Sequence, residues 1–223
     1  MAAIREKAKK FQKFVKGLEG KYAQALPDPK LPLLDNFVFY LLLYSNPVTH
    51  AKKAFRALRD EKRFAGWMEV RVATPREIAE VLEENKISHA QFLAPRLKQF
   101  LQKVFEEVDA VAFEPLLERI QEAEDAKKRR DRTSKAKEWI NGLPGIPPWG
   151  PTYLLTGLGF ERALPWDPHT EAVLEAQKVF PPKATLAQKK RVAKALLEGL
   201  DGLDPLQVHH LLVEYAKRDL KRR

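Results

Sequence analysis

The chain has 223 residues and no cysteine, and its 40 Lys and Arg outnumber 30 Asp and Glu, giving a formal net charge of +10. The lack of cysteine excludes disulfides, thiolate-held iron–sulfur clusters, zinc fingers built on cysteine and a cysteine nucleophile. Hydrophobic residues make up 44%, an ordinary globular share that supports a real core. No apolar run approaches the ~18–20 residues of a membrane span and no secretory signal is visible, so we expect a soluble cytoplasmic protein, associated with the nucleoid if the source is bacterial.

The positive charge is concentrated in three blocks. Residues 1–30, 126–139 and 183–223 each carry a net charge of +5, and the chain between them is slightly acidic. Such blocks suit a polyanion such as nucleic acid, because binding releases the counterions of its phosphates. A solvated face that keeps the protein soluble would give the same pattern.

Helical spacing of apolar residues dominates from the start of the chain. The first helix is amphipathic and ends near Gly20, and the prolines of 26–32 predict an extended connector. We expect Asp35 to cap a buried helix over 36–44. The next helix is predicted over 48–59.

A second group of helices follows a clear start signal. Thr74-Pro75-Arg76-Glu77 combines an N-cap, a proline in the first turn and a glutamate at the third position, so a helix begins there and ends near Glu84. Apolar spacing predicts the remaining helices over 89–107, 113–122, 132–140, 151–158, 168–179, 185–199 and 205–219. No alternating β-branched run or Asn-Gly turn occurs, so we predict an all-α protein of about ten short helices.

The segment 143–150, Leu-Pro-Gly-Ile-Pro-Pro-Trp-Gly, joins two predicted helices directly after a basic block. The free N–H groups and the positive dipole at the start of the second helix can face a phosphate. Pro147, Pro148 and Pro151 have no N–H to donate, however, and an ordinary corner between two helices would give the same pattern.

A second candidate segment is 164–170, Leu-Pro-Trp-Asp-Pro-His-Thr. An Asp before a proline at the start of a helix, as Asp167 is, is most often only an N-cap. Placed between Trp166 and His169 and followed by an apolar helix, Asp167 is also a candidate general base or stabiliser of a positively charged transition state.

Together the two segments resemble the helix–hairpin–helix (HhH-GPD) DNA glycosylase superfamily, which includes endonuclease III and 3-methyladenine DNA glycosylase II. Leu-Pro-Gly-Ile at 143–146 matches the hairpin, Asp167 falls on the essential aspartate, and His169 is similar to the histidine of the endonuclease III branch. The resemblance covers about 33–215. It implies an all-α fold of two helical lobes, with the hairpin and Asp167 at the cleft between them.

The resemblance also implies a domain organisation. We expect a basic N-terminal helix and Pro-rich connector over 1–32, a helical glycosylase domain over 33–216 and a basic tail over 217–223. Within the glycosylase domain we expect a central lobe over about 48–140 and the hairpin over 141–152.

Two positions depart from the family pattern. Trp149 occupies the place where bifunctional members carry a lysine, so no amine is present to form a Schiff base, and lyase activity should be absent or weak. A tryptophan there is similar to 3-methyladenine DNA glycosylase II, which is monofunctional. Pro147 replaces the second hairpin glycine and removes one N–H from the phosphate site.

The resemblance implies a mechanism in which the target nucleotide is flipped out of the duplex. Asp167 would then stabilise the oxocarbenium-like sugar or orient the attacking water. The candidates for the base pocket are Trp149, Trp166, Tyr44 and His169. Aromatic faces suit an electron-poor alkylated base, although on composition alone both tryptophans are more often core or rim packing.

The candidate DNA-binding residues follow from the hairpin and the basic block. Asn46 would fill the space left by the flipped nucleotide, although an Asn before a proline is also an ordinary helix stop. The others are Gly145, Ile146, Gly150, Thr152, Arg129, Arg130, Arg132, Lys135 and Lys137.

We predict no cofactor, and the hairpin carbonyls are candidates to hold a monovalent cation, as they do in the family. The histidines show no metal-ligand spacing, and His209 and His210 are interpreted as helix packing or surface. The expected function is a monofunctional DNA glycosylase that acts on an alkylated or otherwise damaged base, as a monomer on duplex DNA and with no membrane partner. The alternatives are a non-catalytic DNA-binding protein on the same scaffold and an RNA- or ribosome-associated helical protein.

Overall fold

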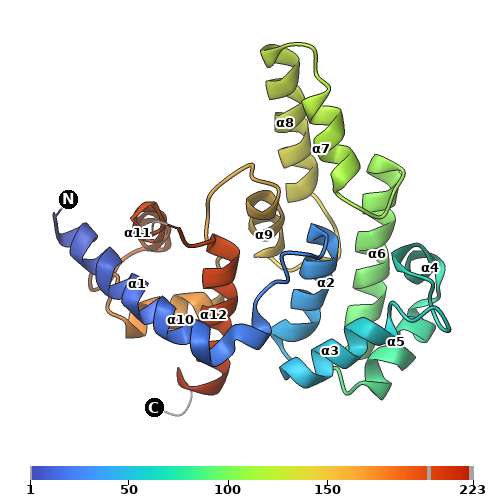
Figure 1. Ribbon diagram of the computed structural model, residues 1–223, viewed down its shortest axis with the longest axis horizontal. Coiled ribbons are helices and arrows are strands. Elements are labelled where there is room, and N and C mark those ends of the chain that lie inside the picture. Colours follow the sequence, from blue (N-terminus) through green and yellow to red (C-terminus); the bar gives the residue numbers. More distant parts are fainter. Residues whose placement is uncertain (1, 200–201, 221–223) are drawn as a thin grey trace. The chain divides into compact units, whose positions relative to one another are not determined.

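The computed structural model describes residues 2–199 and 202–220, and within them it contains twelve α-helices, one short 3₁₀ helix and no strand (Figure 1). The prediction of an all-α protein is therefore confirmed. The chain forms two compact units, which we call unit 1 (Met1–Pro27 and Pro148–Arg223) and unit 2 (Asp28–Pro147). The boundaries between the units lie in the Pro-rich connector and in the predicted hairpin. None of the described helices combines the length and hydropathy that a membrane crossing needs.

Unit 2 is built from seven helices. They are α2 (Leu33–Tyr44), α3 (Val48–Ala57), α4 (Trp67–Val72), α5 (Pro75–Glu84), α6 (Ala90–Val108), α7 (Glu114–Gln121) and α8 (Ala126–Asn141). A row of aromatic rings runs through its core: Phe37 contacts Phe100, Phe100 contacts Phe113, and Phe113 contacts Trp139 of α8, with ring centroids 5.2, 6.4 and 6.3 Å apart. This row of rings packs α2, α6 and α8 together. The paired rings lie far apart in the sequence, so local helix propensity does not predict these contacts.

The predicted start of α5 is confirmed in detail. Thr74 Oγ1 accepts a hydrogen bond from the backbone N–H of Glu77 at 3.2 Å, and the Glu77 carboxylate accepts one from the backbone N–H of Thr74 at 2.7 Å. Each side chain thus satisfies a backbone donor that the first helical turn leaves without a partner.

The prediction that Asp35 caps α2 is wrong. The helix begins three residues earlier than predicted, at Leu33, with Pro32 as its N-cap, so Asp35 lies in the first turn. Its buried Oδ1 instead accepts a hydrogen bond from Trp67 Nε1 at 3.2 Å and pairs with Arg59 Nη1 at 2.7 Å. Burial raises the pKa of Asp35, while the Arg59 charge and the Trp67 bond oppose that rise.

Unit 1 is built from five helices and a 3₁₀ turn. They are α1 (Ala2–Tyr22), η1 (Ala23–Ala25), α9 (Gly150–Gly157), α10 (Pro168–Ala176), α11 (Leu186–Glu198) and α12 (Pro205–Arg218). Every residue of α12 from Val208 to Ala216 is buried, and α1, α9 and α10 pack against it. The N-terminal helix contributes Phe11 and Val15 to the core of this unit. Of the predicted basic tail, 221–223 lie outside the described residues, and Lys217 and Arg218 form the last turn of α12.

Candidate functional site

Asp167 is the N-cap of α10 and lies in the core of unit 1. Its backbone is extended (φ −143°, ψ 170°), and Pro168 occupies the first helical position, as the sequence indicates. Asp167 Oδ1 accepts a hydrogen bond from the backbone N–H of Thr170 at 2.8 Å. The residue as a whole is only 3% exposed, which is unusual for an ionisable group.

The second oxygen of this carboxylate faces a histidine of α12. Asp167 Oδ2 lies 3.4 Å from His209 Nε2 and forms no hydrogen bond with any described residue. The other ring nitrogen, His209 Nδ1, lies 3.1 Å from the hydroxyl of Thr170. Asp167, Thr170 and His209 therefore form a closed ring of polar side chains, all buried, which connects the start of α10 to the middle of α12.

Burial shifts the pKa values of both ionisable members toward their neutral forms. It raises the pKa of Asp167 to about 6, although the backbone N–H groups of Thr170 and His169 oppose the rise. Burial also lowers the pKa of His209 well below its usual value, so the imidazole is neutral at pH 7. A neutral ring that accepts the Thr170 hydroxyl proton at Nδ1 directs its Nε2–H toward Asp167 Oδ2.

Aromatic side chains of α9 and the residue before it fix the orientation of this ring. The Trp149 indole packs against His209, with centroids 5.9 Å apart, and against Tyr153 at 6.0 Å. The Tyr153 hydroxyl lies 3.0 Å from His210 Nε2, and His210 Nδ1 lies 2.7 Å from the carbonyl oxygen of Ala25. Within unit 1 the structure thus brings Trp149, a predicted pocket residue, to the histidine that faces Asp167.

The other predicted pocket residues lie as follows. Trp166 is half-buried, and its Nε1 donates to Glu171 Oε2 at 3.2 Å. His169 is half-buried in the first turn of α10. Tyr44, at the end of α2 in unit 2, is half-buried, and its ring is 6.2 Å from that of Tyr40.

Asn46, predicted to enter the duplex, is buried in unit 2 and engaged with the backbone there. Its amide nitrogen donates to the carbonyl oxygen of Leu42 at 2.7 Å, and its Oδ1 accepts from the backbone N–H of Ser88 at 2.7 Å. These bonds hold the end of α2 to the segment before α6. A role at the duplex would require Asn46 to leave both bonds.

The hairpin residues are clamped by an arginine of α6. Gly145 has φ +78°, and a Cβ built on it would lie 2.2 Å from the carbonyl oxygen of Arg96, so only glycine fits. In return, Arg96 Nε donates to the carbonyl oxygen of Gly145 at 3.2 Å, and Arg96 Nη2 donates to that of Ile146 at 3.3 Å. The carbonyls that are candidates for a monovalent cation therefore already interact with a positive group of the chain.

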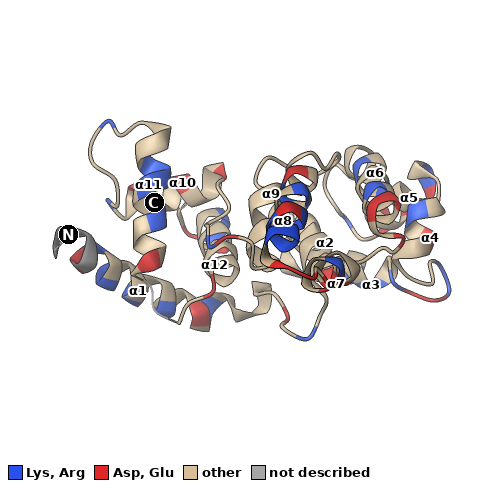
Figure 2. Cartoon of the chain, turned by 90° about the horizontal axis from the view of Figure 1, so that it is seen from above, with Lys and Arg blue, Asp and Glu red and all other residues tan. Residues whose placement is uncertain are grey.

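The remaining predicted DNA-binding residues lie on two helices. Gly150 and Thr152 form the first turn of α9, with Gly150 buried and Thr152 half-buried. The basic candidates all lie on α8, where Figure 2 shows the blue of Lys and Arg together with some red of Asp and Glu: Arg129, Arg130, Arg132, Lys135 and Lys137. In the part of the chain that the structure describes, no three His, Asp or Glu side chains gather as metal ligands would.

The sequence did not identify His209 and Thr170 as site residues. His209 was interpreted as packing or surface, and Thr170 only ended the motif that carries Asp167. The signal available was a pair of histidines, 209 and 210, in an otherwise apolar helix. Buried polar groups need partners, so such a pair predicts polar side chains on a neighbouring element, but the sequence does not say which element.

One comparison with solved structures bears on the fold. The structure of a thermostable thymine-DNA glycosylase matches this chain with a TM-score of 0.59 and 13% sequence identity, over 96% of this chain and 87% of that chain. At this identity the match shows that the two proteins share an all-helical fold. No family model and no curated protein matches the sequence.

Proposed function

We propose that this chain is a monofunctional DNA glycosylase, a hydrolase that cleaves the N-glycosidic bond of a damaged or mispaired base in duplex DNA. The observation that supports this most directly is Asp167, a buried carboxylate at the start of α10 whose pKa is raised to about 6. Buried carboxylates with perturbed pKa values are concentrated at functional sites. The fold shared with a thymine-DNA glycosylase supports the same reaction class by analogy.

The proposed reaction requires a group that tolerates positive charge on the sugar. As the bond between C1′ and the base nitrogen breaks, its electron pair leaves with the base and the sugar becomes oxocarbenium-like. A carboxylate stabilises this charge more strongly when it is removed from water. Water then adds to C1′ and gives up a proton, to Asp167 or to solvent, leaving an abasic site.

Thr170 and His209 act as positioning residues in this proposal. Thr170 fixes one carboxylate oxygen of Asp167 through its backbone N–H, and His209 stands beside the other oxygen as a neutral group. Because neither neighbour is cationic, the negative charge of Asp167 is not neutralised before the sugar becomes positive. A carboxylate that is held in place and still negatively charged can stabilise the oxocarbenium-like sugar electrostatically.

The absence of lyase activity is part of the proposal. Trp149, at the position that carries a lysine in bifunctional members, is buried between His209 and Tyr153 and has no nucleophilic amine. Without a Schiff base at C1′, β-elimination has no covalent intermediate. Strand breaks should therefore require added alkali.

The proposed substrate is a base that is flipped out of the duplex at a low free-energy cost. Extrusion costs a few kcal/mol and least for a damaged or mispaired nucleotide. The resemblance in the sequence points to alkylated purines, and the structural neighbour is described as acting on thymine. We therefore extend the candidate substrates to mispaired thymine.

The test is base release from duplexes that contain alkylated purines, uracil, thymine glycol, 8-oxoguanine or mispaired thymine. Wild type would be compared with Asp167→Asn and with Asp204→Asn, a matched change at the exposed N-cap of α12. We expect release by wild type and Asp204→Asn, loss in Asp167→Asn, and strand breaks only after alkali. Retained activity in Asp167→Asn would refute its role. No release by wild type, with salt-sensitive DNA binding intact, would favour the non-catalytic DNA-binding alternative, for which Pro147 is the supporting feature.

A further inference from the structure

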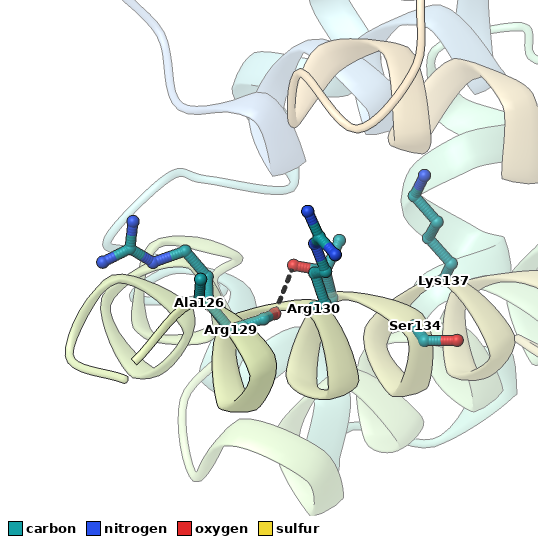
Figure 3. Close-up of a pocket in the computed structure, with 6 residues that line it drawn as sticks. Ala126, Arg129, Arg130, Ser134 and Lys137 are labelled. Atoms are coloured by element: carbon teal, nitrogen blue, oxygen red, sulfur yellow. Dashed lines mark hydrogen bonds between the residues drawn. The ribbon is translucent and has the colours of Figure 1, made fainter. Parts of the chain in front are cut away.

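The seven Lys and Arg residues of α8 do not share one surface. Arg129, Arg130 and Lys137 line a shallow hollow of about 420 Å³ together with Ala126, Thr133 and Ser134. Figure 3 shows the three cationic side chains extending from the same side of the helix. The lining contains no acidic residue, and no ion pair joins these three cations to any residue that the structure describes.

Three other cations of α8 are engaged by the protein, and one of them, Lys128, pairs with Glu124. Arg132 donates a hydrogen bond to the carbonyl oxygen of Arg119, and Lys135 pairs with Asp131 at 2.9 Å. The neighbouring hollow on this side carries charges of both signs: Glu107, Arg119, Glu122, Arg132 and Lys135. The sequence analysis placed five cations of α8 in one phosphate-binding set, and the structure separates them into two groups: Arg129, Arg130 and Lys137 in one, and Arg132 and Lys135 in the other.

We propose that Arg129, Arg130 and Lys137, which we call the α8 cationic face, form a docking surface for the phosphate backbone of duplex DNA, whereas Arg132 and Lys135 do not. This inference rests on the proposed function for its partner. It deepens that function because it names which cations of α8 hold the substrate.

The dimensions of the α8 cationic face suit a nucleic-acid strand. Eight residues separate Arg129 from Lys137, which corresponds to about 12 Å of helix. One strand of B-DNA presents a phosphate about every 3.4 Å along the duplex axis, so about three phosphates lie within that length. The hydroxyl of Ser134, between the cations, adds a donor of the kind that contacts phosphate oxygens.

The composition of the same face favours a duplex backbone over single strands. Proteins that bind single-stranded nucleic acid combine cations with aromatic rings on which bases stack. The lining consists of Ala, Arg, Thr, Ser and Lys side chains and offers no aromatic ring. Contacts to phosphates alone position a duplex without reading its sequence, which a repair enzyme needs in order to search undamaged DNA.

The test is the salt dependence of binding to an undamaged duplex. Arg130→Gln/Lys137→Gln would be compared with Arg132→Gln/Lys135→Gln, since each pair removes one arginine and one lysine from the same helix. The slope of log K against log salt is negative, and each lost phosphate contact reduces its magnitude by about 0.9, so the first pair should reduce the magnitude by about 1.8. Affinity at 0.1 M salt should then fall by about 60-fold relative to wild type. The second pair should leave both quantities nearly unchanged.

Each outcome separates this inference from the proposed function. Equal slopes of log K against log salt for the two double variants would contradict the proposed role of the α8 cationic face in DNA binding. Base release, measured in its own assay, would still support the glycosylase function. A difference in slope without any base release would support the face and contradict catalysis. Tighter binding to single-stranded RNA than to duplex DNA would contradict the proposal that duplex DNA is the partner of this face. Thermal unfolding of both pairs serves as the folding control, and a large loss of stability confined to the first pair would be tested with Arg129→Gln alone.

Discussion

Asp167→Asn should stabilise the protein at neutral pH while it abolishes base release. The substitution keeps the shape of the side chain, and Asn is as good an N-cap as Asp, so the bond from the Thr170 N–H to Oδ1 is retained. What it removes is a buried negative charge. Because burial raises the pKa of Asp167 from 3.8 to about 6, the folded state bears a free-energy cost for the ionised form.

The size of this effect follows from the shift in pKa. A shift of roughly 2 units corresponds to about 3 kcal/mol at about 1.4 kcal/mol per unit. Losing a charge at the positive end of the α10 dipole offsets about 0.3–1 kcal/mol of this gain. A net gain of about 2 kcal/mol should raise the Tm by about 4–8 °C in a chain of this size.

The pH dependence gives the sharper test. A carboxyl whose folded pKa is raised binds more protons in the folded state between pH 3.8 and about 6, so its cost is absent below that window and complete above it. Denaturant unfolding at pH 4 and pH 7 should therefore show Asp167→Asn nearly equal to wild type at pH 4 and more stable at pH 7. Asp204→Asn, at an exposed N-cap, is the matched control for loss of a carboxylate at a helix start. A variant destabilised at pH 7, or a gap that does not change with pH, would refute the assignment of a buried charge.

Three further predictions concern stability. Gly145→Ala should cost about 1–3 kcal/mol more than Gly159→Ala in thermal unfolding, because both glycines have positive φ but only at Gly145 would the new Cβ meet a backbone oxygen, that of Arg96. Equal losses would contradict this clash. Burial lowers the pKa of His210 to about 3, so the stability of wild type should fall by about 1.4 kcal/mol per pH unit below pH 6.5 from this group alone, and denaturant unfolding of His210→Gln should show a shallower acid slope. Asn46→Ala removes the partner of the buried Leu42 carbonyl and of the backbone N–H of Ser88, an exposed residue, and should lower the free energy of unfolding by about 1–3 kcal/mol, mainly through the carbonyl, whereas an unchanged value would indicate that these bonds are replaced by water.

Much of the fold could be predicted because local signals and packing agree. Thr74 and Glu77 form the capping box that their spacing indicates, and Pro168 follows its N-cap as expected. Helix α8 is longer than the predicted 132–140 because its first turns, 126–131, contain charged residues with no apolar period. Asp125 caps that start through the N–H of Lys128 at 2.7 Å, a signal that hydrophobic spacing does not detect.

The arrangement around the candidate site could be predicted only in part. Asp167 and its place at the head of a helix follow from the local sequence, but its contact with His209 joins residues 42 positions apart. That contact depends on the rotation of α12 against α10, and an almost wholly buried helix has no amphipathic period that would fix such a rotation. The division of the α8 cations likewise depends on where α7 packs, which determines that Arg132 meets a carbonyl of Arg119.

Capping alone does not account for the position of Asp167. Asp125 and Asp204 also accept backbone N–H groups at the starts of α8 and α12, and both residues are exposed, so water also reaches these carboxylates. Asp167 performs the same local task while buried, and its second oxygen lies beside a neutral His209 with no cation to compensate it. Since Asn would cap α10 as well without the cost of a buried charge, the carboxylate is explained by a requirement for the charge itself. In the proposed function, stabilisation of a cationic sugar is such a requirement, and the gain in stability of Asp167→Asn would measure how much folding free energy the protein forgoes to meet it.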